Sequence, residues 1–397
     1  MQYRKNIKNN DNLSLLGLGC LRFFNKRGTI DEDVGIDLIR KAIKAGVNYF
    51  DTAYIYLNGQ SEVILGKALK DGYRDKAFIA TKLPHFLVRK PKDIEKLFNT
   101  SLQRLQTDYI DYYLIHMLCD IAVWNKLEKF GIKQWIKDKK EKGIIKNIGF
   151  SFHGRYEEFE NLIEAYDWDF CQIQYNYLDI NYQAGTAGLR YANKKGLPII
   201  IMEPLRGGLL VNGLPKEAGK LLEEKNITPQ ELGLSWLFDQ PEVTVALSGM
   251  SSEEQLNDNV VLTDKYPANS LSAEQKQLAT EVKKLIDVNI KVPCTACRYC
   301  MPCPSGVNIP ACFATYNEKY TLKHKKTLLN YERNTGSYGS KPGNAGQCTN
   351  CGACVKLCPQ NINIPVELAA VKKDIETPFF KFHNSATRIL FGTKNKD

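Results

Sequence analysis

The stretch YIDYYLIH, at residues 109–116, is a run of mostly aromatic and aliphatic residues that ends in a histidine. A short, nearly continuous apolar run of this kind is typical of a strand buried on both faces of a parallel sheet. Helical patterns lie on either side of it, at residues 91–106 and 122–142. A buried strand between two helices is the repeating unit of an α/β fold.

The same unit recurs along most of the chain. The other predicted strands cover residues 13–20, 47–53, 77–83, 147–152, 170–175, 198–202 and 243–248. Further helical patterns separate them, for example at 31–45, 61–70 and 185–195. Eight strand–helix units predict a (β/α)8 TIM barrel. The alternative, a doubly wound sheet, lacks its phosphate fingerprint, because GLGCLR at residues 17–22 has no third glycine.

The composition is that of an ordinary globular protein: of 397 residues, 43% are hydrophobic and 25% are charged. The chain has no run of about 18 apolar residues that could span a membrane, and no secretory signal at its start. The net charge of +10 counts every cysteine as neutral, and no motif that reads nucleic acid occurs. We therefore expect a cytoplasmic protein without a membrane or nucleic-acid partner.

Twelve cysteines are the most informative feature of the composition, because nine of them follow residue 293. Thiols stay reduced in the cytoplasm, so such clustering indicates metal binding before disulfides. A run with the spacing of a bacterial ferredoxin is Cys348-x2-Cys351-x2-Cys354-x3-Cys358-Pro359. An earlier run, one residue shorter, consists of Cys294, Cys297, Cys300 and Cys303, followed by Pro304.

Two such runs predict two [4Fe–4S] clusters. In a two-cluster ferredoxin the fourth cysteine of a run binds the other cluster. By this rule cluster one takes Cys294, Cys297, Cys300 and Cys358, and cluster two takes Cys348, Cys351, Cys354 and Cys303. Whether the fourth cysteines exchange between the clusters in this way stays open. Two structural zinc sites with four cysteine ligands each are the alternative, but zinc sites usually use two separated pairs of cysteines. Cys312 is left over and is expected to be a core thiol.

A change in composition after residue 293 divides the chain into domains. We expect the barrel over 1–288, closed by a helix at 272–288, and a small ferredoxin-like domain of helices and loops over 289–376. Each cysteine run is followed by a similar segment, VNIP at 307–310 and INIP at 362–365, which implies a pseudo-twofold module. For the basic, phenylalanine-rich tail at 377–397, docking on the barrel and disorder are the two alternatives.

Polar residues gather where the predicted barrel strands end, which is the face where TIM-barrel chemistry lies. The second strand ends near Asp51, with Tyr56 just beyond it. The third strand ends at Lys82 and the fourth at His116. Each of these groups terminates an otherwise apolar run, a position that suits catalysis better than packing.

The residues that surround these positions resemble the aldo-keto reductase superfamily. The resemblance covers roughly residues 1–290 and is carried by Gly17-Leu18-Gly19, Asp51-Thr52-Ala53-Tyr54-Ile55-Tyr56, Ser61-Glu62, Thr81-Lys82 and Leu114-Ile115-His116. The cysteine-rich part resembles the branch of that family fused to a ferredoxin-like domain. The resemblance implies an oxidoreductase that interconverts a small carbonyl compound and an alcohol with NADPH or NADH.

The resemblance also implies catalytic roles for the four strand-end residues. Tyr56 would be the general acid that protonates the carbonyl oxygen. A free tyrosine has a pKa of about 10, and a nearby Lys82 ammonium would lower it by favouring the phenolate. Asp51 would pair with Lys82 and hold it, and His116 would orient the carbonyl or donate to its oxygen.

Positions for the nicotinamide cofactor follow from the same resemblance. They are Ser151 and Gln172 for the carboxamide, Pro204, Leu205, Arg206 and Gly208 for the pyrophosphate, and Ser248, Gly249, Met250, Gln255, Asp258 and Asn259 for the adenosine phosphate. Met202 stands where the family has a stacking tyrosine, and Phe152 where it has an asparagine. Gly249 and Gln255 replace basic residues around the 2′-phosphate. The choice between NADP and NAD therefore stays open, with Arg206 a candidate for the missing charge.

The two halves of the chain suggest different redox chemistry. A hydride carries two electrons, whereas a [4Fe–4S] cluster passes one at a time, and no flavin motif is present. We expect the clusters to take electrons from a redox partner protein or to serve structure or sensing. The alternative function is an iron–sulfur electron-transfer protein in which the barrel is a docking or regulatory scaffold.

Overall fold

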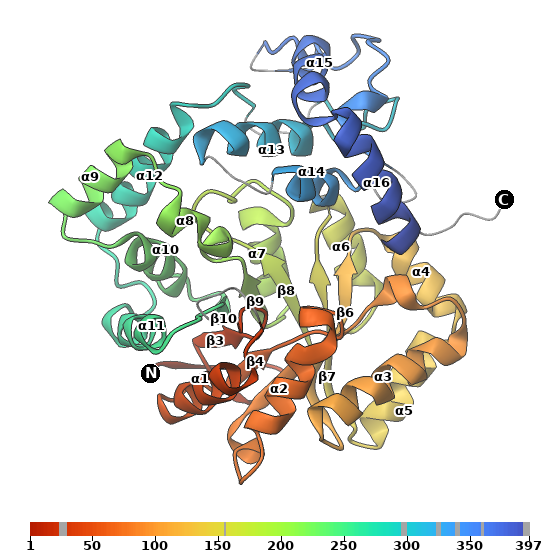
Figure 1. Ribbon diagram of the computed structural model, residues 1–397, viewed down its shortest axis with the longest axis vertical. Coiled ribbons are helices and arrows are strands. Elements are labelled where there is room, and N and C mark those ends of the chain that lie inside the picture. The colour runs from red at the N-terminus through yellow and green to blue at the C-terminus, as the bar shows by residue number, and fades with distance from the viewer. Residues whose placement is uncertain are drawn as a thin grey trace. The chain divides into compact units, whose positions relative to one another are not determined.

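The computed structural model describes residues 1–23, 30–154, 156–294, 300–322, 327–337, 342–358 and 361–391 (Figure 1). The chain divides into two compact units, the first of residues 1–210 and 227–280, the second of 211–226 and 281–397. The domain limits expected at 288 and 376 stay predictions. No helix in the described part of the chain is long and apolar enough to cross a membrane.

The first unit is a closed barrel of parallel strands, which confirms the predicted (β/α)8 fold. Its strands, neighbour by neighbour, are β10 (Val243–Ser248), β3 (Leu16–Gly19), β4 (Tyr49–Asp51), β5 (Phe78–Leu83), β6 (Ile110–Leu118), β7 (Ile145–Phe152), β8 (Phe170–Gln174) and β9 (Ile199–Met202). Every one overlaps an apolar run identified in the sequence. The largest core cluster packs these strands against the surrounding helices.

The alternation of side chains along the strands positions the polar residues. Tyr49, Ala80, Leu114 and Phe170 belong to the apolar cluster that fills the barrel. Successive side chains in a strand point to opposite faces, so the residue two positions further on points the same way. Two residues beyond each of them come Asp51, Lys82, His116 and Gln172. One polar layer therefore lies on top of the apolar filling, at the carboxyl ends of the strands.

The helices of the barrel follow the predicted order. They are α1 (Glu32–Lys44), α2 (Gln60–Ala68), α3 (Pro91–Leu105), α4 (Ile121–Lys129), α5 (Ile132–Glu141), α6 (Tyr156–Ala165), α7 (Gly185–Lys194), α8 (Leu209–Asn212), α10 (Pro229–Phe238), α11 (Glu253–Lys265) and α12 (Ala273–Asp287). The single helix expected at 122–142 is wrong, because α4 and α5 are separate. Gly131 between them has a φ of +81°, a left-handed conformation that interrupts a right-handed helix.

An N-terminal hairpin, β1 (Tyr3–Lys5) and β2 (Asn12–Ser14), was not expected from the sequence. The strand predicted at 13–20 is divided between β2 and β3. The hairpin reaches the barrel interior through Tyr112, whose hydroxyl donates to Asp11 Oδ2 at 2.6 Å and accepts from Asn6 Nδ2 at 3.0 Å. Polar side chains thus cover the end of the barrel opposite to the polar layer.

The second unit contains α9 (Lys216–Glu224), α13 (Ile309–Thr321), α14 (Thr327–Thr335), α15 (Ile364–Ile375) and α16 (Pro378–Phe391). The sequence repeat is visible in its helices, because α13 and α15 both begin at the Asn-Ile-Pro of their segment. Part of the predicted tail forms α16. Phe380 of α16 is buried against Tyr331, and His383 Nδ1 lies 2.9 Å from Glu332 Oε2.

Two adjacent tyrosines test the contribution of the hairpin. We predict that Tyr112→Phe lowers the free energy of unfolding of the barrel by about 1–3 kcal/mol, because it leaves the buried Asn6 amide without an acceptor. Tyr113→Phe is the matched control, since the Tyr113 hydroxyl is buried without a hydrogen-bond partner among the described residues. Urea unfolding followed by circular dichroism measures both. Equal losses in the two variants would contradict this account.

Candidate active site

A buried ion pair forms the base of the polar layer. Lys82 Nζ lies 2.6 Å from Asp51 Oδ1 and donates to the Thr52 carbonyl at 2.7 Å. The second oxygen of Asp51 accepts from Gln172 Nε2 at 2.8 Å. Lys82 is 1% exposed. Burial lowers the pKa of Lys82 below its ordinary value, and the attraction of Asp51 offsets part of that effect.

Tyr56 lies beside this ion pair. It begins the short 3-10 helix η1 (Tyr56–Gly59), and its amide donates to the Ala53 carbonyl at 3.0 Å. The centre of its ring is 5.0 Å from Lys82 Nζ and 6.0 Å from the His116 ring, which it meets edge-on. Tyr56 is partly exposed, so a substrate can reach it. The structure thus brings together all four residues predicted at the strand ends.

His116 is buried with its Nδ1 atom unpartnered among the described residues. Burial, reinforced by the nearby Lys82 charge, holds the pKa of His116 well below its ordinary value. The imidazole is therefore neutral at neutral pH. A neutral imidazole can donate a hydrogen bond to an uncharged carbonyl without adding a second cation to the site.

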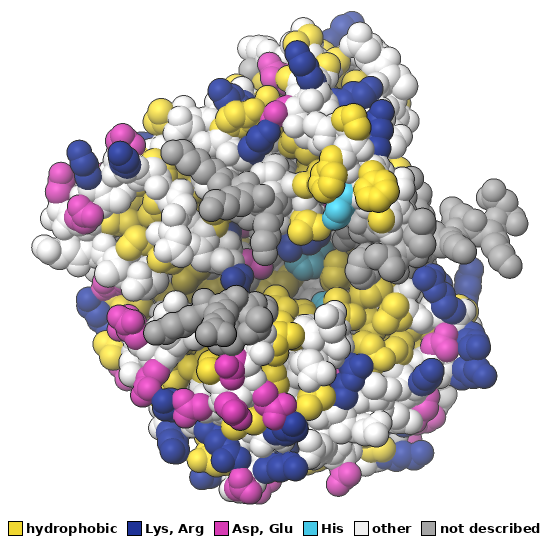
Figure 2. All heavy atoms as spheres, viewed as in Figure 1, with side chains coloured by type: hydrophobic (Ala, Val, Ile, Leu, Met, Phe, Trp, Pro, Cys, Tyr) yellow, Lys and Arg dark blue, Asp and Glu magenta, His cyan; other side chains and the backbone are white. Residues whose placement is uncertain are grey.

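Two further histidines follow barrel strands and were missed in the sequence analysis. His85 comes two residues after β5 and packs on Phe86, which lies 6.3 Å from the His116 ring. Burial lowers the pKa of His85 to about 4. His153 follows β7 directly, and its Nδ1 is 3.2 Å from Gln183 Oε1. Figure 2 shows histidine side chains in the hollowed centre of this face. The positions of His85 and His153 shortly after strand ends are the sequence feature that could have identified them as site residues.

The residues predicted to hold the carboxamide are neighbours on β7 and β8. Ser151 and Gln172 are paired in register, and both are about 1% exposed. Ser151 Oγ accepts from the Met117 amide at 2.9 Å, and the Gln172 amide nitrogen is already engaged by Asp51. The same glutamine contacts the buried ion pair and lies next to Ser151, the other residue predicted to hold the carboxamide.

The loop after β9 combines arginine and glycine in a way that suits a pyrophosphate. Gly207 and Gly208 have φ of +66° and +91°. Arg206 Nε lies 3.1 Å from Asp179 Oδ2, so its charge is compensated. Arg22, which the sequence analysis did not assign to the site, lies against two glycines. A Cβ would be 2.8 Å from Arg22 Nη2 at Gly207 and 2.9 Å from Arg22 Cδ at Gly249.

This cradle fits a nicotinamide dinucleotide. A guanidinium packed against glycine backbone offers hydrogen-bond donors and positive charge to an anionic group. Arg22 follows the Gly17-Leu18-Gly19 strand by three residues, which was the signal that could have identified it. Arg22 thus gives the loop a second positive charge in addition to that of Arg206.

The segment after β10 arranges its predicted residues in two groups. Ser248, Met250 and Asn259 are buried, and Asn259 Nδ2 donates to Ser248 Oγ at 3.1 Å. Gln255 and Asp258 are exposed on α11. Gln255 Oε1 accepts from the Ser251 amide at 2.9 Å, next to the Ser252 side chain that caps the helix. The buried residues hold the segment in place, and the side chains of Gln255 and Asp258 remain accessible to a ligand.

The cysteines of the second unit that the structure describes are Cys294, Cys300, Cys303, Cys312, Cys348, Cys351, Cys354 and Cys358. Burial raises the pKa of Cys354, and the neighbouring thiols of Cys303, Cys348 and Cys351 add to the effect. Those three are the partners predicted for Cys354 in cluster two. Cys297 lies outside the described residues.

The thiols fit an iron–sulfur cluster by their chemistry. No three His, Cys, Asp or Glu side chains of the described residues converge on one metal position. Each thiolate of a cubane binds a different iron, so convergence on one point is not required. Cys312 is fully buried, with its Sγ 3.6 Å from the Tyr331 hydroxyl and 3.4 Å from the Gly343 carbonyl. These contacts match the core thiol expected at that position.

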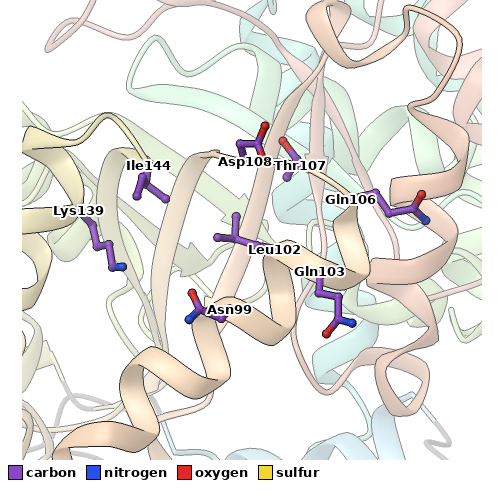
Figure 3. A pocket seen from close by; sticks show the side chains of 8 residues that line it. All are labelled: Asn99, Leu102, Gln103, Gln106, Thr107, Asp108, Lys139 and Ile144. Atoms are coloured by element: carbon purple, nitrogen blue, oxygen red, sulfur yellow. The ribbon is translucent and has the colours of Figure 1, made fainter.

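A surface pocket of about 370 Å³ lies elsewhere on the first unit (Figure 3). Residues of α3 and the turn that follows it supply most of its wall, together with Lys139 and Ile144. It contains none of the residues of the polar layer.

Comparison with known proteins places these observations in a family context. The model of the Aldo/keto reductase family matches residues 15–275, and that of a 4Fe-4S dicluster domain matches residues 293–362. The NADH-specific methylglyoxal reductase of Escherichia coli (strain K12) is 27% identical over 300 residues, covering 62% of this chain and 89% of that protein. Methylglyoxal reductase YeaE from the same organism is 25% identical over 246 residues, covering 59% and 81%.

Solved structures agree on the barrel. The holo form of aldo-keto reductase AKR11C1 from Bacillus halodurans has a TM-score of 0.60 at 25% identity, covering 71% of this chain and 96% of that one. A structure of aldo-keto reductase from Klebsiella pneumoniae in complex with NADPH has a TM-score of 0.58 at 23% identity, with the same coverage. The similarity to both structures extends over the barrel fold.

The neutral state of His116 has a consequence for stability. Its pKa is ordinary, about 6.5, in the unfolded chain and well below that in the folded chain. Above pH 6.5 His116 is neutral in both states and does not affect the free energy of unfolding. Below that pH the free energy of unfolding falls, because the unfolded chain takes up a proton at His116 and the folded chain does not. We predict that His116→Asn removes up to about 1.4 kcal/mol per pH unit from this slope.

Unfolding by urea at several pH values between 7.5 and 5 measures the slope. Tyr113→Phe, which changes no group titrating in this range, is the control. Parallel pH profiles of wild type and His116→Asn would show that this imidazole is not held neutral by its burial.

Proposed function

The chain belongs to the aldo/keto reductase family and carries a C-terminal 4Fe-4S dicluster domain; we propose that this NAD(P)H-dependent oxidoreductase reduces a small carbonyl compound with Tyr56 as proton donor. The observation that carries the proposal is the position of the Tyr56 ring, 5.0 Å from Lys82 Nζ and edge-on to His116. A phenol beside a buried ammonium is what protonation of a carbonyl oxygen requires.

Each residue of the polar layer has a separate role in the proposed reaction. A reduced nicotinamide, when bound, supplies the hydride to the carbonyl carbon. Tyr56 gives its hydroxyl proton to the oxygen as negative charge develops there. The Lys82 ammonium stabilises the phenolate that remains, and Asp51 holds Lys82 in place. Oxidation of an alcohol uses the same groups in reverse.

His116 positions the substrate. Because its imidazole is neutral, it donates a hydrogen bond to the carbonyl oxygen and does not compete with Lys82 as a second cation. His85 and His153 lie nearby and add polar groups to the rim of the site. A compound with a second oxygen beside its carbonyl suits such a rim. Two relatives are named methylglyoxal reductases, so methylglyoxal is the first substrate to assay.

The cofactor contacts follow the glycine-lined cradle. Ser151 and Gln172 hold the carboxamide, and Arg22 joins Pro204, Leu205, Arg206 and Gly208 around the pyrophosphate. Ser248, Gly249, Met250, Gln255, Asp258 and Asn259 form the adenosine end. Position 255 carries no cation, and the first turn of α11 is acidic, which favours NADH over NADPH.

The second unit adds one-electron chemistry. We assign two [4Fe–4S] clusters to it, one on Cys294, Cys297, Cys300 and Cys358 and the other on Cys348, Cys351, Cys354 and Cys303. Cys351 is exposed, so a cluster held there would lie near the surface, where it would supply one-electron chemistry to a redox partner protein. The same exposure favours a second candidate function, an electron-transfer protein with the barrel as scaffold.

Tyr56→Phe separates these functions. We predict that the substitution lowers kcat for methylglyoxal about 10²–10⁴-fold, because it removes the proton donor and leaves the ring in place. Binding of NADH, followed by fluorescence titration, should be unchanged. Tyr54→Phe, two residues earlier in the same loop, is the matched control and should keep most of the activity. Wild-type turnover that survives in Tyr56→Phe would remove this tyrosine from the mechanism.

The cluster assignment is tested by iron content. After anaerobic purification, wild type should contain the iron of two clusters, and Cys354→Ser should lose about half of it, because cluster two loses a ligand. Cys312→Ser is the control and should keep the full amount. Iron analysis and electron paramagnetic resonance of the reduced protein measure both. Retention of full iron by Cys354→Ser would refute the ligand set.

A further inference from the structure

We propose that Arg104, together with Glu62, is a positioning residue for Tyr56: it fixes the loop that carries the phenol against the strand that carries Lys82. The proposal rests on the function assigned to Tyr56 above. Arg104 lies in the last turn of α3. It contacts the loop on both sides of Tyr56 and pairs with Glu62 of α2.

The loop that carries Tyr56 contains residues in the energetically unfavourable left-handed backbone conformation. Directly after Tyr56, Leu57 and Asn58 have φ of 50° and 54°, and Gly59 has φ of 90°. A left-handed conformation costs a residue with a side chain about 1–2 kcal/mol. Such a segment persists only where surrounding contacts determine it. The strain therefore requires an external clamp.

The Arg104 side chain provides that clamp. Its Nη1 donates to the Tyr54 carbonyl at 2.9 Å, and its guanidinium lies 4.4 Å from the centre of the Tyr54 ring. On the other side of Tyr56, Gly59 lies so close that a Cβ there would be 2.7 Å from Arg104 Cζ. One planar group thus contacts the loop two residues before the phenol and three residues after it.

Glu62 connects the clamp to the catalytic strand. Its carboxylate is fully buried, with Oε2 3.1 Å from Arg104 Nη1 and Oε1 accepting from Thr81 Oγ1 at 2.7 Å. Thr81 directly precedes Lys82 on β5. The path Arg104–Glu62–Thr81 therefore sets the distance between the Tyr56 phenol and the Lys82 ammonium.

The chain offers a matched control at the opposite end of the barrel. Arg74 Nη2 pairs with the buried Asp111 at 2.8 Å, its Nη1 donates to the Ala77 carbonyl at 2.8 Å, and its guanidinium lies 4.0 Å from the centre of the Tyr109 ring. It has the same kinds of contact as Arg104 but none with the loop of Tyr56. Arg74 also donates to Thr107 Oγ1 at 3.1 Å and to the Tyr109 carbonyl at 3.2 Å. Arg74→Lys should therefore lower the free energy of unfolding at least as much as Arg104→Lys.

The two variants should differ at Tyr56. Lysine at position 104 keeps the charge beside Glu62 but loses the planar guanidinium that lies against the Tyr54 ring and Gly59. We expect Arg104→Lys to lower kcat about 10–100-fold, because small misplacements of catalytic groups have effects of this size. The KM for NADH should stay unchanged. Arg74→Lys should keep the wild-type kcat.

A second readout does not depend on turnover. Tyrosine labelled with ¹³C at the ring carbon that bears the hydroxyl reports each phenol by NMR, and Tyr56→Phe identifies the signal of residue 56. This signal should titrate at higher pH in Arg104→Lys than in wild type, since the phenol moves away from the Lys82 ammonium. It should not change in Arg74→Lys.

The outcomes separate this proposal from the proposed function. Wild type without carbonyl turnover would refute the function, while a titration shift confined to Arg104→Lys would still support the clamp. An unshifted Tyr56 signal with wild-type kcat in Arg104→Lys would overturn it. Equal losses of kcat in the two arginine variants would also overturn it, because the effect would then follow stability alone.

Discussion

The burial of one ammonium group is the constraint on which the catalytic end of this barrel depends. Lys82 is almost inaccessible to water, and a charge taken out of water is costly unless it is paired and hydrogen-bonded. Asp51 and the Thr52 carbonyl meet this requirement on one side, and Gln172 occupies the remaining oxygen of Asp51. Removal of one partner from such a pair typically costs about 3–5 kcal/mol.

The closed parallel sheet makes this pair possible. Its strands all end at the same face, and the alternation of side chains lifts one polar residue from each of several strands above an apolar filling. Tyr56 enters from a strained loop, so the rigid sheet supplies the ammonium and the loop supplies the phenol. The cost of that loop is offset by contacts from α2 and α3, which keep the two groups close enough for electrostatic coupling.

The second unit relies on a more local principle. Its cysteines are grouped within short runs, so under the proposed assignment neighbouring residues in the chain would be ligands of one cluster with little help from distant contacts. The exception in the proposed assignment is the fourth cysteine of each run, which we assign to the cluster of the other run. The grouping of Cys354 with Cys303 follows this pattern, although more than forty residues separate them. The pseudo-twofold repeat makes such an exchange possible.

The sequence alone determined the barrel, its eight strands, the four strand-end residues and the cysteine runs, because periodicity and spacing are local properties. Only the tertiary structure decided the N-terminal hairpin and the contacts of Arg22 and Arg104. These depend on contacts between segments far apart in the chain: Arg104 reaches Tyr54, and Gln172 reaches Asp51. Such pairings leave no trace in local pattern, since they arise only when the barrel closes.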